Sequence, residues 1–383
     1  MNYLKKMNNT IIHIITSLDV GGAENSLYKL IASNNLLGYT SIVICLKGKG
    51  VFGKKLMREG IKVIYLDLKI YNFLKNIFML IRLIKKTNPA LIQGWMYHGN
   101  LLAFLLKRIS FAKFKIAWNI RHSLSDVTNE KFLLRQVIFV NKILSRYIDL
   151  VIYNSVTSFN QHKKFGFREP HSKVIPNGFS IPKKKDKDDR DEFRNRLGCQ
   201  RSDIIIGNIA RYHPMKGHLK LLEAFLIIHQ NIKNIKLLFA GRGVSDGNNE
   251  LYKRIDNLNL ENIILLDEVS NPLDYLDAMD IFCLPSLWGE GFSNILGEAV
   301  SIGTLSVASN VGDASLIIGK NGFLYENDDR NANLVNALLK AINLDLNKKK
   351  EMVSKARSNF INNYELKKSS QYYLEVYNNL LEV

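Results

Sequence analysis

Short apolar runs, each ending in a glycine or polar turn and followed by a helical pattern, recur along both halves of this chain. Runs of this kind occupy residues 11–15, 90–94, 204–207, 235–240 and 281–284. A chain that alternates strands with helices folds into parallel sheets covered by helices. Because 383 residues exceed what a single hydrophobic core usually holds, the sequence predicts an α/β protein with two Rossmann-like domains.

A charged run without apolar side chains, residues 182–192, separates the two halves. Solvated linkers between domains have this composition. We therefore expect one domain over residues 1–180 and a second over residues 181–365. Within the first domain, we expect strands at residues 40–46 and 61–66 with basic loops between them.

Residues 72–86 have the spacing of an amphipathic helix. The side chains of Leu74, Ile77, Phe78, Ile81 and Ile84 fall on one stripe, with basic residues elsewhere on the helix. Such a helix packs on a sheet more often than it lies on a membrane, and we expect the packed arrangement here. The membrane surface is the alternative.

The net charge of +18 belongs almost entirely to the first half of the chain. Residues 1–180 carry 27 Lys and Arg against 8 Asp and Glu, a net of +19, and the other residues carry 26 against 27, a net of −1. Such a field attracts an anionic partner, and we expect an acidic membrane surface. General solubility and nucleic acid are the alternatives, although no stretch interleaves aromatic residues with Lys and Arg as nucleic-acid binding requires.

No apolar run has the length needed to span a bilayer, and the N-terminus lacks a secretory pattern. The three cysteines, Cys45, Cys199 and Cys283, are widely spaced, and two of them stand in apolar, strand-like runs. We expect them to be small buried side chains rather than disulfides or metal ligands. This usage indicates a reducing, cytoplasmic setting.

Two carboxylates, Glu290 and Glu298, bracket the start of a helix expected from Asn294, directly after the strand at residues 281–284. The eight residue steps from one carboxylate to the other would rise roughly 12 Å in a helix, about the length of a nucleotide-sugar. The first turn offers unpaired N–H groups and a positive dipole end, which suit a phosphate. A loop-to-helix junction with one capping and one solvated Glu is the alternative.

The segment Glu-Gly-Phe-Ser-Asn-Ile-Leu-Gly-Glu over residues 290–298 resembles the Glu-(seven residues)-Glu motif of retaining glycosyltransferase family 4. That resemblance implies the GT-B fold, in which two Rossmann-like domains face across a cleft and the C-terminal helix, here 366–383, crosses back to the first domain. It also implies that residues 1–180 bind the acceptor and that residues 181–365 bind the nucleotide-sugar. Glu290 would orient the donor sugar and Glu298 the ribose. The other donor-binding residues implied here are Gly291, Phe292, Ser293, Asn294 and Ile295.

Arg211 and Lys216 flank a proline-containing turn after the strand at residues 204–207, so both cations can converge on a diphosphate. The pair resembles the Arg-(four residues)-Lys pair with which the same family neutralises the leaving nucleotide. Two surface cations near a helix start are the alternative. The resemblance also places Gly243 beneath the nucleotide and the loop containing Val269 against the base, through backbone groups.

In the first domain, Gly21 and Gly22 follow the first expected strand, where glycine lets the backbone approach a phosphate or sugar. They resemble the Gly-Gly-Ala-Glu loop of the family. His98 lies in what we expect to be a small polar turn after the strand at residues 90–94, and it resembles the family histidine beside the reacting sugar. Arg121 and His122, one strand later, are expected to contact the acceptor.

The resemblance implies an enzyme that moves a hexose or N-acetylhexosamine, with retention, from a nucleotide diphosphate sugar, most simply a UDP-sugar. The acceptor would be a saccharide, lipid-linked at the inner face of the cytoplasmic membrane, in O-antigen or capsule biosynthesis. No His, Cys or Asp set has the spacing of metal ligands, so we expect no metal and no other cofactor. A nucleotide-sugar 2-epimerase and a non-enzymatic basic protein that binds nucleic acid are the alternatives.

Overall fold

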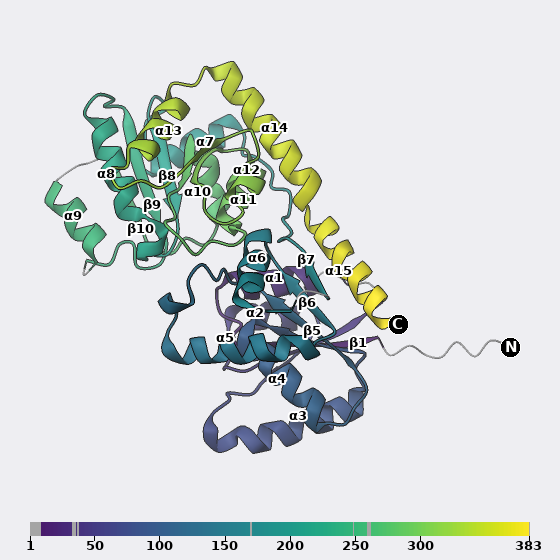
Figure 1. The fold of residues 1–383 in the computed structure, drawn as a ribbon. Helices are drawn as coiled ribbons and strands as arrows, with labels where there is room; N and C mark the ends of the chain where they lie inside the picture. The colour runs from purple at the N-terminus through teal and green to yellow at the C-terminus, as the bar shows by residue number, and fades with distance from the viewer. Residues whose placement is uncertain are drawn as a thin grey trace. The chain divides into compact units, whose positions relative to one another are not determined.

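The computed structural model describes residues 9–32, 36, 38–168, 171–247, 249–258 and 262–382. Contacts divide the chain into two compact units, one of Met1–Gly178 with Leu366–Val383 and one of Phe179–Glu365 (Figure 1). Each unit contains one parallel sheet between helices, which confirms the predicted α/β class. The acceptor-binding and donor-binding roles expected of the two domains remain predictions.

The first unit, here called unit 1, contains a seven-stranded sheet in the order β3-β2-β1-β4-β5-β6-β7. Its strands are β1 (Thr10–Ile15), β2 (Thr40–Cys45), β3 (Lys62–Tyr65), β4 (Leu91–Trp95), β5 (Lys115–Ile120), β6 (Leu150–Tyr153) and β7 (Ser172–Val174). Its α-helices are α1 (Gly22–Ile31), α2 (Val51–Arg58), α3 (Phe73–Thr87), α4 (Met96–Ile109), α5 (Phe132–Leu144), α6 (Val156–Phe165) and α15 (Leu366–Leu381).

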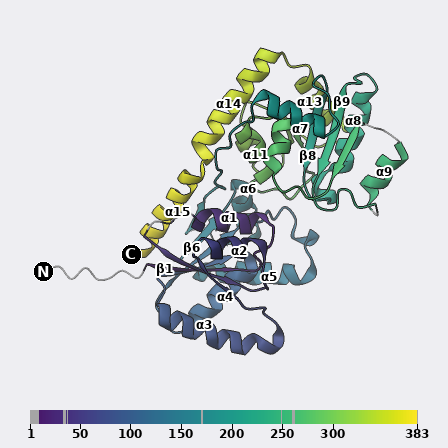
Figure 2. The ribbon, with the colours of Figure 1, turned by 180° about the vertical axis from the view of Figure 1, so that it is seen from behind.

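Two cores lie on opposite faces of this sheet. On one face, α3, α4, α5 and α6 supply Ile77, Leu102 and Ile138 among others. On the other face, α1, α2 and α15 supply side chains that include Leu27 and Tyr377. In both Figure 1 and Figure 2, α3 and α4 lie below the strands of unit 1 and α1 lies above them. The last helix of the chain therefore packs in the first unit, as the sequence predicts.

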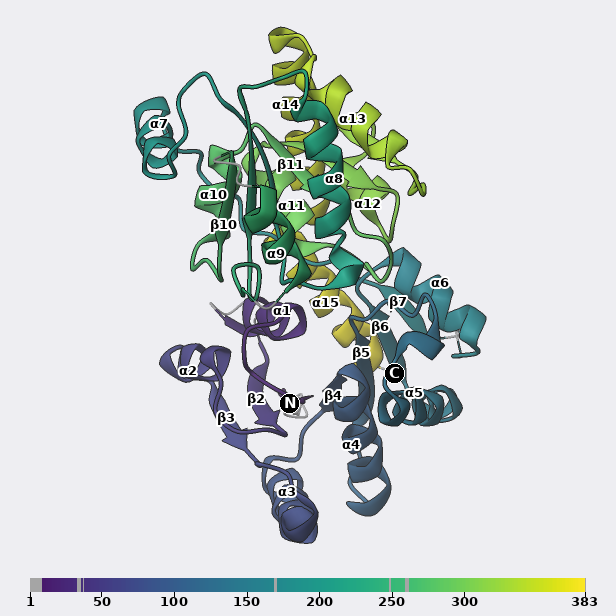
Figure 3. The ribbon, with the colours of Figure 1, turned by 90° about the vertical axis from the view of Figure 1, so that its left-hand side faces the viewer.

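The second unit, unit 2, contains a six-stranded parallel sheet in the order β10-β9-β8-β11-β12-β13. Its strands are β8 (Ile204–Ile209), β9 (Ile235–Ala240), β10 (Ile263–Leu266), β11 (Ile281–Leu284), β12 (Leu305–Ser309) and β13 (Phe323–Tyr325). Its helices are α7 (Lys187–Arg196), α8 (His218–His229), α9 (Glu250–Leu258), α10 (Pro272–Ala278), α11 (Asn294–Ile302), α12 (Ala314–Ile318), α13 (Ala332–Ile342) and α14 (Leu346–Tyr364), with a short 3-10 helix, η5 (Pro214–Lys216) (Figure 3).

Two predictions about connecting segments are wrong. The charged run at residues 182–192 is not all linker, because α7 begins at Lys187. Asp186 caps this helix by accepting from the Asp189 N–H at 2.9 Å, and Arg194 is buried, with its guanidinium 2.9 Å from Asp280. The segment between β2 and β3 likewise contains α2, whose Phe52 and Leu56 pack in the core. The sequence of residues 25–34 also predicts a helix, with Leu27, Leu30 and Ile31 facing inward. In the structure this helix, α1, begins earlier, at Gly22, and buries these three side chains, while residues 33 and 34 lie outside the described residues.

The stripe predicted for residues 72–86 is partly wrong as well. Helix α3 buries Ile77 and Ile84 as expected, but Leu74 and Phe78 are 69% and 65% exposed. The helix is rotated because Asn76, a polar residue, faces the sheet and donates to the Leu66 carbonyl at 3.2 Å. The predicted burial of Cys45, Cys199 and Cys283 as free thiols is confirmed.

Three buried histidines should make the protein sensitive to acid. Burial lowers the pKa of His13 to about 3 and those of His162 and His218 to about 4, so their imidazoles stay neutral in the folded chain. In the unfolded chain they protonate below pH 6.5, so the unfolded state binds more protons and stability is lost as the pH falls from about 6.5 towards 4. Each histidine can contribute at most ~1.4 kcal/mol per pH unit. We expect the melting temperature to fall between pH 7 and pH 5, and a flat profile would contradict neutral burial.

Candidate functional site

The order of strands in unit 2 reverses between β8 and β11, and ligands of doubly wound sheets bind at the carboxyl ends of strands at such a reversal. Arg211 and Lys216 follow β8, and Glu290 follows β11. The structure therefore brings these three predicted residues to one edge of one sheet. Gly243, after β9, and Val269, after β10, lie at the same edge.

Lys216 and Glu290 form an ion pair whose Nζ and Oε1 atoms are 2.6 Å apart. The carboxylate is buried, and the Ser286 hydroxyl donates to the same oxygen at 2.7 Å. The Ser286 carbonyl in turn accepts from the Ser309 hydroxyl at 2.6 Å. Glu290 is thus held in one position before any ligand arrives, while the guanidinium of Arg211 is exposed to solvent.

The loops after β8 and β11 are packed against each other at their backbones. The Leu287 N–H donates to the Met215 carbonyl at 2.8 Å. Gly217 has a φ of +67°, and a Cβ there would lie 1.9 Å from the Pro285 carbonyl oxygen. Gly289 is similar, with a φ of +75° and a Cβ position 2.4 Å from the sulfur of Met215. At Gly217 the neighbour is backbone and leaves no room for a side chain, whereas at Gly289 the flexible Met215 side chain could move and the positive φ is what favours glycine. The close approach at Gly217 joins the loop of Lys216 to the loop of Glu290.

Helix α11 begins directly after this loop. Its N-cap residue, Ser293, does not cap the helix with its side chain. The first turn of a helix is where anionic groups are favoured. Glu298 is half-buried on the same helix, and Ile295 is partly buried against the core. Phe292 packs its ring in the core, and the donor contact expected of its backbone remains a prediction. The Gly291 carbonyl is already engaged, since it accepts from the Asp313 N–H at 2.9 Å.

Two residues that hold this edge together were not singled out from the sequence. Ser286 orients Glu290, and Asp267 accepts from the Gly243 N–H through Oδ1 at 3.0 Å. The only signal for Ser286 was its position four residues before Glu290, in the loop that carries the motif. Nothing in the sequence pairs Asp267 with Gly243, because the two residues follow different strands.

Unit 1 has its reversal between β1 and β4. Gly21 and Gly22 follow β1, and His98 follows β4, so the predicted residues again meet at one edge. The predicted turn at His98 is wrong, because α4 begins at Met96 and His98 lies in its first turn. The glycine beside it is required by packing, since a Cβ on Gly99 would lie 2.4 Å from the Ile14 carbonyl oxygen.

The start of α4 carries backbone strain. Met96 has a φ of +61°, which is uncommon for a residue with a large side chain. His98 remains accessible to solvent, and the desolvation of the part of its side chain that is covered, followed by the charge of Lys47, lowers its pKa. Its imidazole is therefore neutral at pH 7 and available to donate or accept a hydrogen bond. Strain of this kind is concentrated at functional sites in proteins.

The two residues expected to contact the acceptor have different surroundings. The Arg121 guanidinium donates to Asn119 at 3.4 Å, to the Tyr373 hydroxyl at 3.2 Å and to Asn177, so it ties β5 to the last helix. His122 is 29% exposed, and its Nε2 lies 3.1 Å from Glu130. Of the two, His122 has the more accessible side chain. Both acceptor roles remain predictions.

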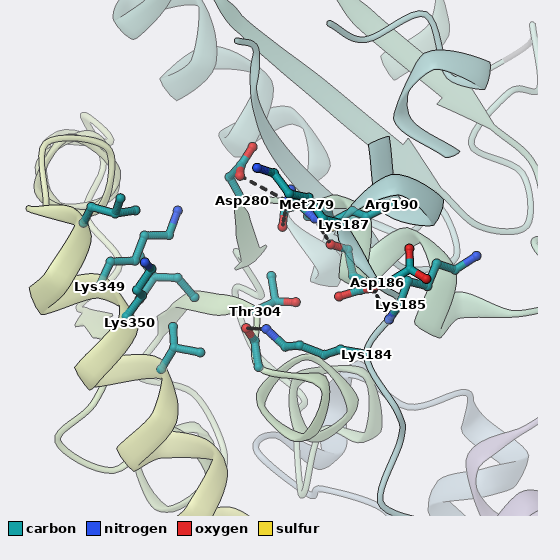
Figure 4. A pocket seen from close by; sticks show the side chains of 15 residues that line it. Lys184, Lys185, Asp186, Lys187, Arg190, Met279, Asp280, Thr304, Lys349 and Lys350 are labelled. Carbon is teal, nitrogen blue, oxygen red and sulfur yellow. Dashed lines mark hydrogen bonds and ion pairs between the residues drawn. The ribbon is translucent and has the colours of Figure 1, made fainter. Parts of the chain in front are cut away.

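A separate basic hollow of about 390 Å³ lies at the amino-terminal edge of the sheet of unit 2 (Figure 4). Residues that precede β11 and β12 line it, together with Lys184 and Lys349. Several of its polar groups are engaged with the protein, since Lys184 donates to the Gly303 carbonyl at 3.1 Å and Arg190 binds Asp280 at 3.2 Å. This hollow is at the opposite end of the strands from Lys216 and Glu290.

Within the described residues, no group of three or more His, Cys, Asp or Glu side chains is arranged to hold a metal ion. No helix in the described part of the chain combines the length and the apolar character needed to cross a membrane.

Two family models match the chain, one in each unit. The model described as Glycosyltransferase Family 4 matches residues 20–181, and the model described as Glycosyl transferases group 1 matches residues 189–359. The chain is a family 4 glycosyltransferase. Its two units are therefore those of a GT-B enzyme, and the transferase is favoured over the 2-epimerase and the nucleic-acid-binding protein considered from the sequence.

Relatives of this glycosyltransferase include the capsular polysaccharide biosynthesis glycosyltransferase CapH of Staphylococcus aureus, which is 27% identical over 80% of this chain and 82% of its own length. The UDP-Gal:alpha-D-GlcNAc-diphosphoundecaprenol alpha-1,3-galactosyltransferase of Escherichia coli is 24% identical over 72% of each chain. Among solved structures, Anabaena Alr3699/HepE in complex with UDP superimposes with a TM-score of 0.84, covering 97% of this chain and 100% of its own at 22% identity, which shows the shared fold.

Proposed function

We propose that this glycosyltransferase moves a hexose or N-acetylhexosamine from a UDP-sugar to a lipid-linked saccharide during capsule or other surface polysaccharide biosynthesis, with retention at the anomeric carbon. The observation that carries the proposal is the cation and carboxylate pair, Lys216 and Glu290, held 2.6 Å apart, the lysine at the end of η5 and the carboxylate in the loop that leads to α11. The names of the staphylococcal and Escherichia coli relatives, and the UDP bound by the Anabaena protein, support the donor and the pathway.

In the proposed reaction, negative charge develops on the departing diphosphate. Arg211, Lys216 and the N–H groups at the start of α11 would stabilise that charge, and this makes a metal ion unnecessary. Glu290 would orient the hydroxyls of the donor sugar and Glu298 those of the ribose. His98, from the other unit, would contact the sugar near the reacting carbon. In the family the leaving phosphate is the usual proposal for the group that takes the acceptor proton.

The proposed acceptor is anionic and membrane-bound, which suits the charge distribution. The first 180 residues carry a net charge of +19, and the relative from Escherichia coli is named for a diphosphoundecaprenol acceptor. We propose that the enzyme works at the inner face of the cytoplasmic membrane as a peripheral protein. An anionic lipid surface would concentrate the protein beside its acceptor, an effect that added salt weakens.

Binding of UDP should raise the melting temperature of the wild-type protein by several degrees. A ligand at about a hundred times its dissociation constant adds roughly 2.7 kcal/mol to the stability of the folded state. We expect UDP to give a larger shift than GDP, ADP or CDP, measured by differential scanning fluorimetry. The shift should vanish in Arg211→Ala/Lys216→Ala and should persist when EDTA is added.

Each arm of this experiment tests a different part of the proposal. A larger shift with another nucleotide would identify that nucleotide, rather than UDP, as the carrier of the donor sugar. Loss of the shift in EDTA would contradict a site that binds without a metal ion. If no nucleotide shifts the melting temperature, the proposed donor site is wrong. A UDP shift that survives in Arg211→Ala/Lys216→Ala would place the diphosphate elsewhere.

A further inference from the structure

The outer face of α3, with the short 3-10 helix η2 (Ile70–Asn72) that precedes it, exposes large apolar side chains. Ile70 is fully exposed, Tyr71 is 81% exposed, and Leu74 and Phe78 are 69% and 65% exposed. Leu74 and Phe78 are four residues apart and lie on one face of α3, and Tyr71 lies in the 3-10 helix directly before it. Isolated apolar side chains on a surface are ordinary, but a contiguous apolar stripe indicates an interaction site.

These side chains are not needed to attach α3 to its own domain. The opposite face of the helix buries Ile77, Leu80 and Ile84 in the core beneath the sheet. The hydrogen bond from Asn76 to the Leu66 carbonyl fixes the rotation about the helix axis. The helix is therefore already packed, and its apolar outer stripe is available for a second partner.

The charged residues around the apolar stripe indicate the kind of partner that would bind it. No Asp or Glu occurs between Asp67 and Asp126, whereas α3 carries Lys75, Arg82 and Lys85 on its exposed side. These cations lie at spacings of three and four residues among and beyond the apolar side chains, so both kinds share one face of the helix. Aromatic and aliphatic side chains flanked by Lys and Arg, without acidic residues, are typical of helices that lie in the headgroup region of anionic membranes.

Other elements of the helix layer that contains α3 also expose large apolar side chains. Helix α5 packs on the same face of the sheet as α3 and α4, as Figures 1 and 3 show, and it too exposes large apolar side chains. On α5 these are Phe132 at 65%, Leu133 at 77% and Phe139 at 48%. Phe111, directly after α4, is 93% exposed. Apolar side chains therefore project from more than one element of this layer.

We propose that η2 and α3 form the membrane-docking surface of this protein, and that Tyr71, Leu74 and Phe78 insert into the headgroup and acyl boundary of an anionic bilayer. Lys75, Arg82 and Lys85 would then contact lipid phosphates. The inference deepens the proposed function, because it names the surface by which unit 1 would reach a lipid-linked acceptor. It does not depend on which sugar is transferred.

The test is binding of the full-length protein to vesicles of equal parts phosphatidylglycerol and phosphatidylcholine, measured by sedimentation. The variant Leu74→Glu/Phe78→Glu should lower the partition coefficient at least about tenfold, because it puts two carboxylates where apolar groups insert. The matched control is Ile227→Glu/Leu316→Glu, which makes the same charge change at two exposed apolar positions of unit 2, 45% and 50% exposed. We expect the control to bind like the wild type.

Equal loss of binding in both double variants would show that net charge alone drives adsorption, and it would overturn the insertion of α3. Absence of vesicle binding by the wild-type protein at low salt would also overturn the proposed insertion of α3. If instead the wild type self-associates in size-exclusion chromatography with light scattering, and only Leu74→Glu/Phe78→Glu is monomeric, the stripe is an interface between two copies rather than a membrane surface.

Insertion can also be observed directly with Phe78→Trp. Its emission should shift to the blue, and acrylamide quenching should fall, when the anionic vesicles are added, whereas Ile227→Trp should show neither change. The UDP-dependent thermal shift of Leu74→Glu/Phe78→Glu should equal that of the wild type. Vesicle binding and the UDP-dependent thermal shift are independent measurements. The proposed docking surface and the proposed donor site can therefore be contradicted separately. An unshifted Phe78→Trp spectrum with vesicles bound would contradict insertion.

Discussion

Replacing Arg211 and Lys216 together by alanine should lower kcat/KM for glycosyl transfer by about a thousandfold or more, or roughly 4 kcal/mol of transition-state stabilisation. Both cations follow β8, and Lys216 lies 2.6 Å from Glu290 at the edge where the diphosphate is expected. Charge on the leaving diphosphate develops in the transition state, so most of the loss should appear in kcat. Initial rates with a UDP-sugar and a lipid-linked acceptor would measure it.

The control for this variant must remove two positive charges from the same unit without touching the site. Lys233→Ala/Lys253→Ala does so, because both side chains are exposed and lie before β9 and on α9. We expect its kcat/KM to stay within about twofold of the wild-type value, as for surface charges far from a reacting centre. If kcat/KM of Arg211→Ala/Lys216→Ala falls by less than about tenfold while the variant remains folded, the two cations do not stabilise the leaving diphosphate.

Loss of Lys216 also removes the cation beside a buried carboxylate, and this effect must be separated from catalysis. Glu290 would keep the Ser286 hydroxyl as its partner, but its charge would be uncompensated in a buried position. Lys216→Arg retains the cation and should recover most of the stability, whereas its different shape should leave much of the catalytic defect. A melting curve for each variant distinguishes the two contributions.

The fold and the motif-bearing loops were predictable because their signals are local. Residues 235–240 are apolar except for Lys236 and are followed by Gly241, and the structure has β9 over the same residues. The helix predicted from Asn294 begins there. Strand ends at a reversal of the strand order bring the following loops together, so Arg211, Lys216 and Glu290 could be placed at one edge before their distances were known.

What could not be predicted depends on contacts between segments that are distant in the sequence. A charged run such as residues 182–192 resembles a linker until Arg190 and Arg194 are seen to bind Asp280, 90 and 86 residues later. The rotation of α3 about its axis is set by the side-chain amide of Asn76. A prediction from the apolar stripe places this polar residue on the solvent side of the helix. In both cases a polar side chain, which patterning assigns to solvent, makes the decisive buried contact.

Gly217→Ala should destabilise unit 2 by ~2–5 kcal/mol and weaken UDP binding. The left-handed conformation, with φ at +67°, costs ~1–2 kcal/mol for any residue with a side chain. The added Cβ would also lie 1.9 Å from the Pro285 carbonyl oxygen, which is backbone and cannot simply rotate away. The loop that carries Lys216 must therefore move from the loop that carries Glu290, which costs a further ~1–3 kcal/mol. Chemical denaturation, followed by UDP titration, would measure both effects.

Gly198→Ala is the control that separates these two costs. Gly198 has a similar φ of +71°, but nothing lies within 4 Å of where its Cβ would be. It should therefore cost only ~1–2 kcal/mol and leave UDP affinity unchanged. If the two variants are equally stable, backbone conformation alone explains Gly217, and the close approach of the two loops is not what holds Lys216 against Glu290. A Gly217→Ala protein that is less stable but binds UDP normally would mean that the loops can separate without losing the diphosphate site.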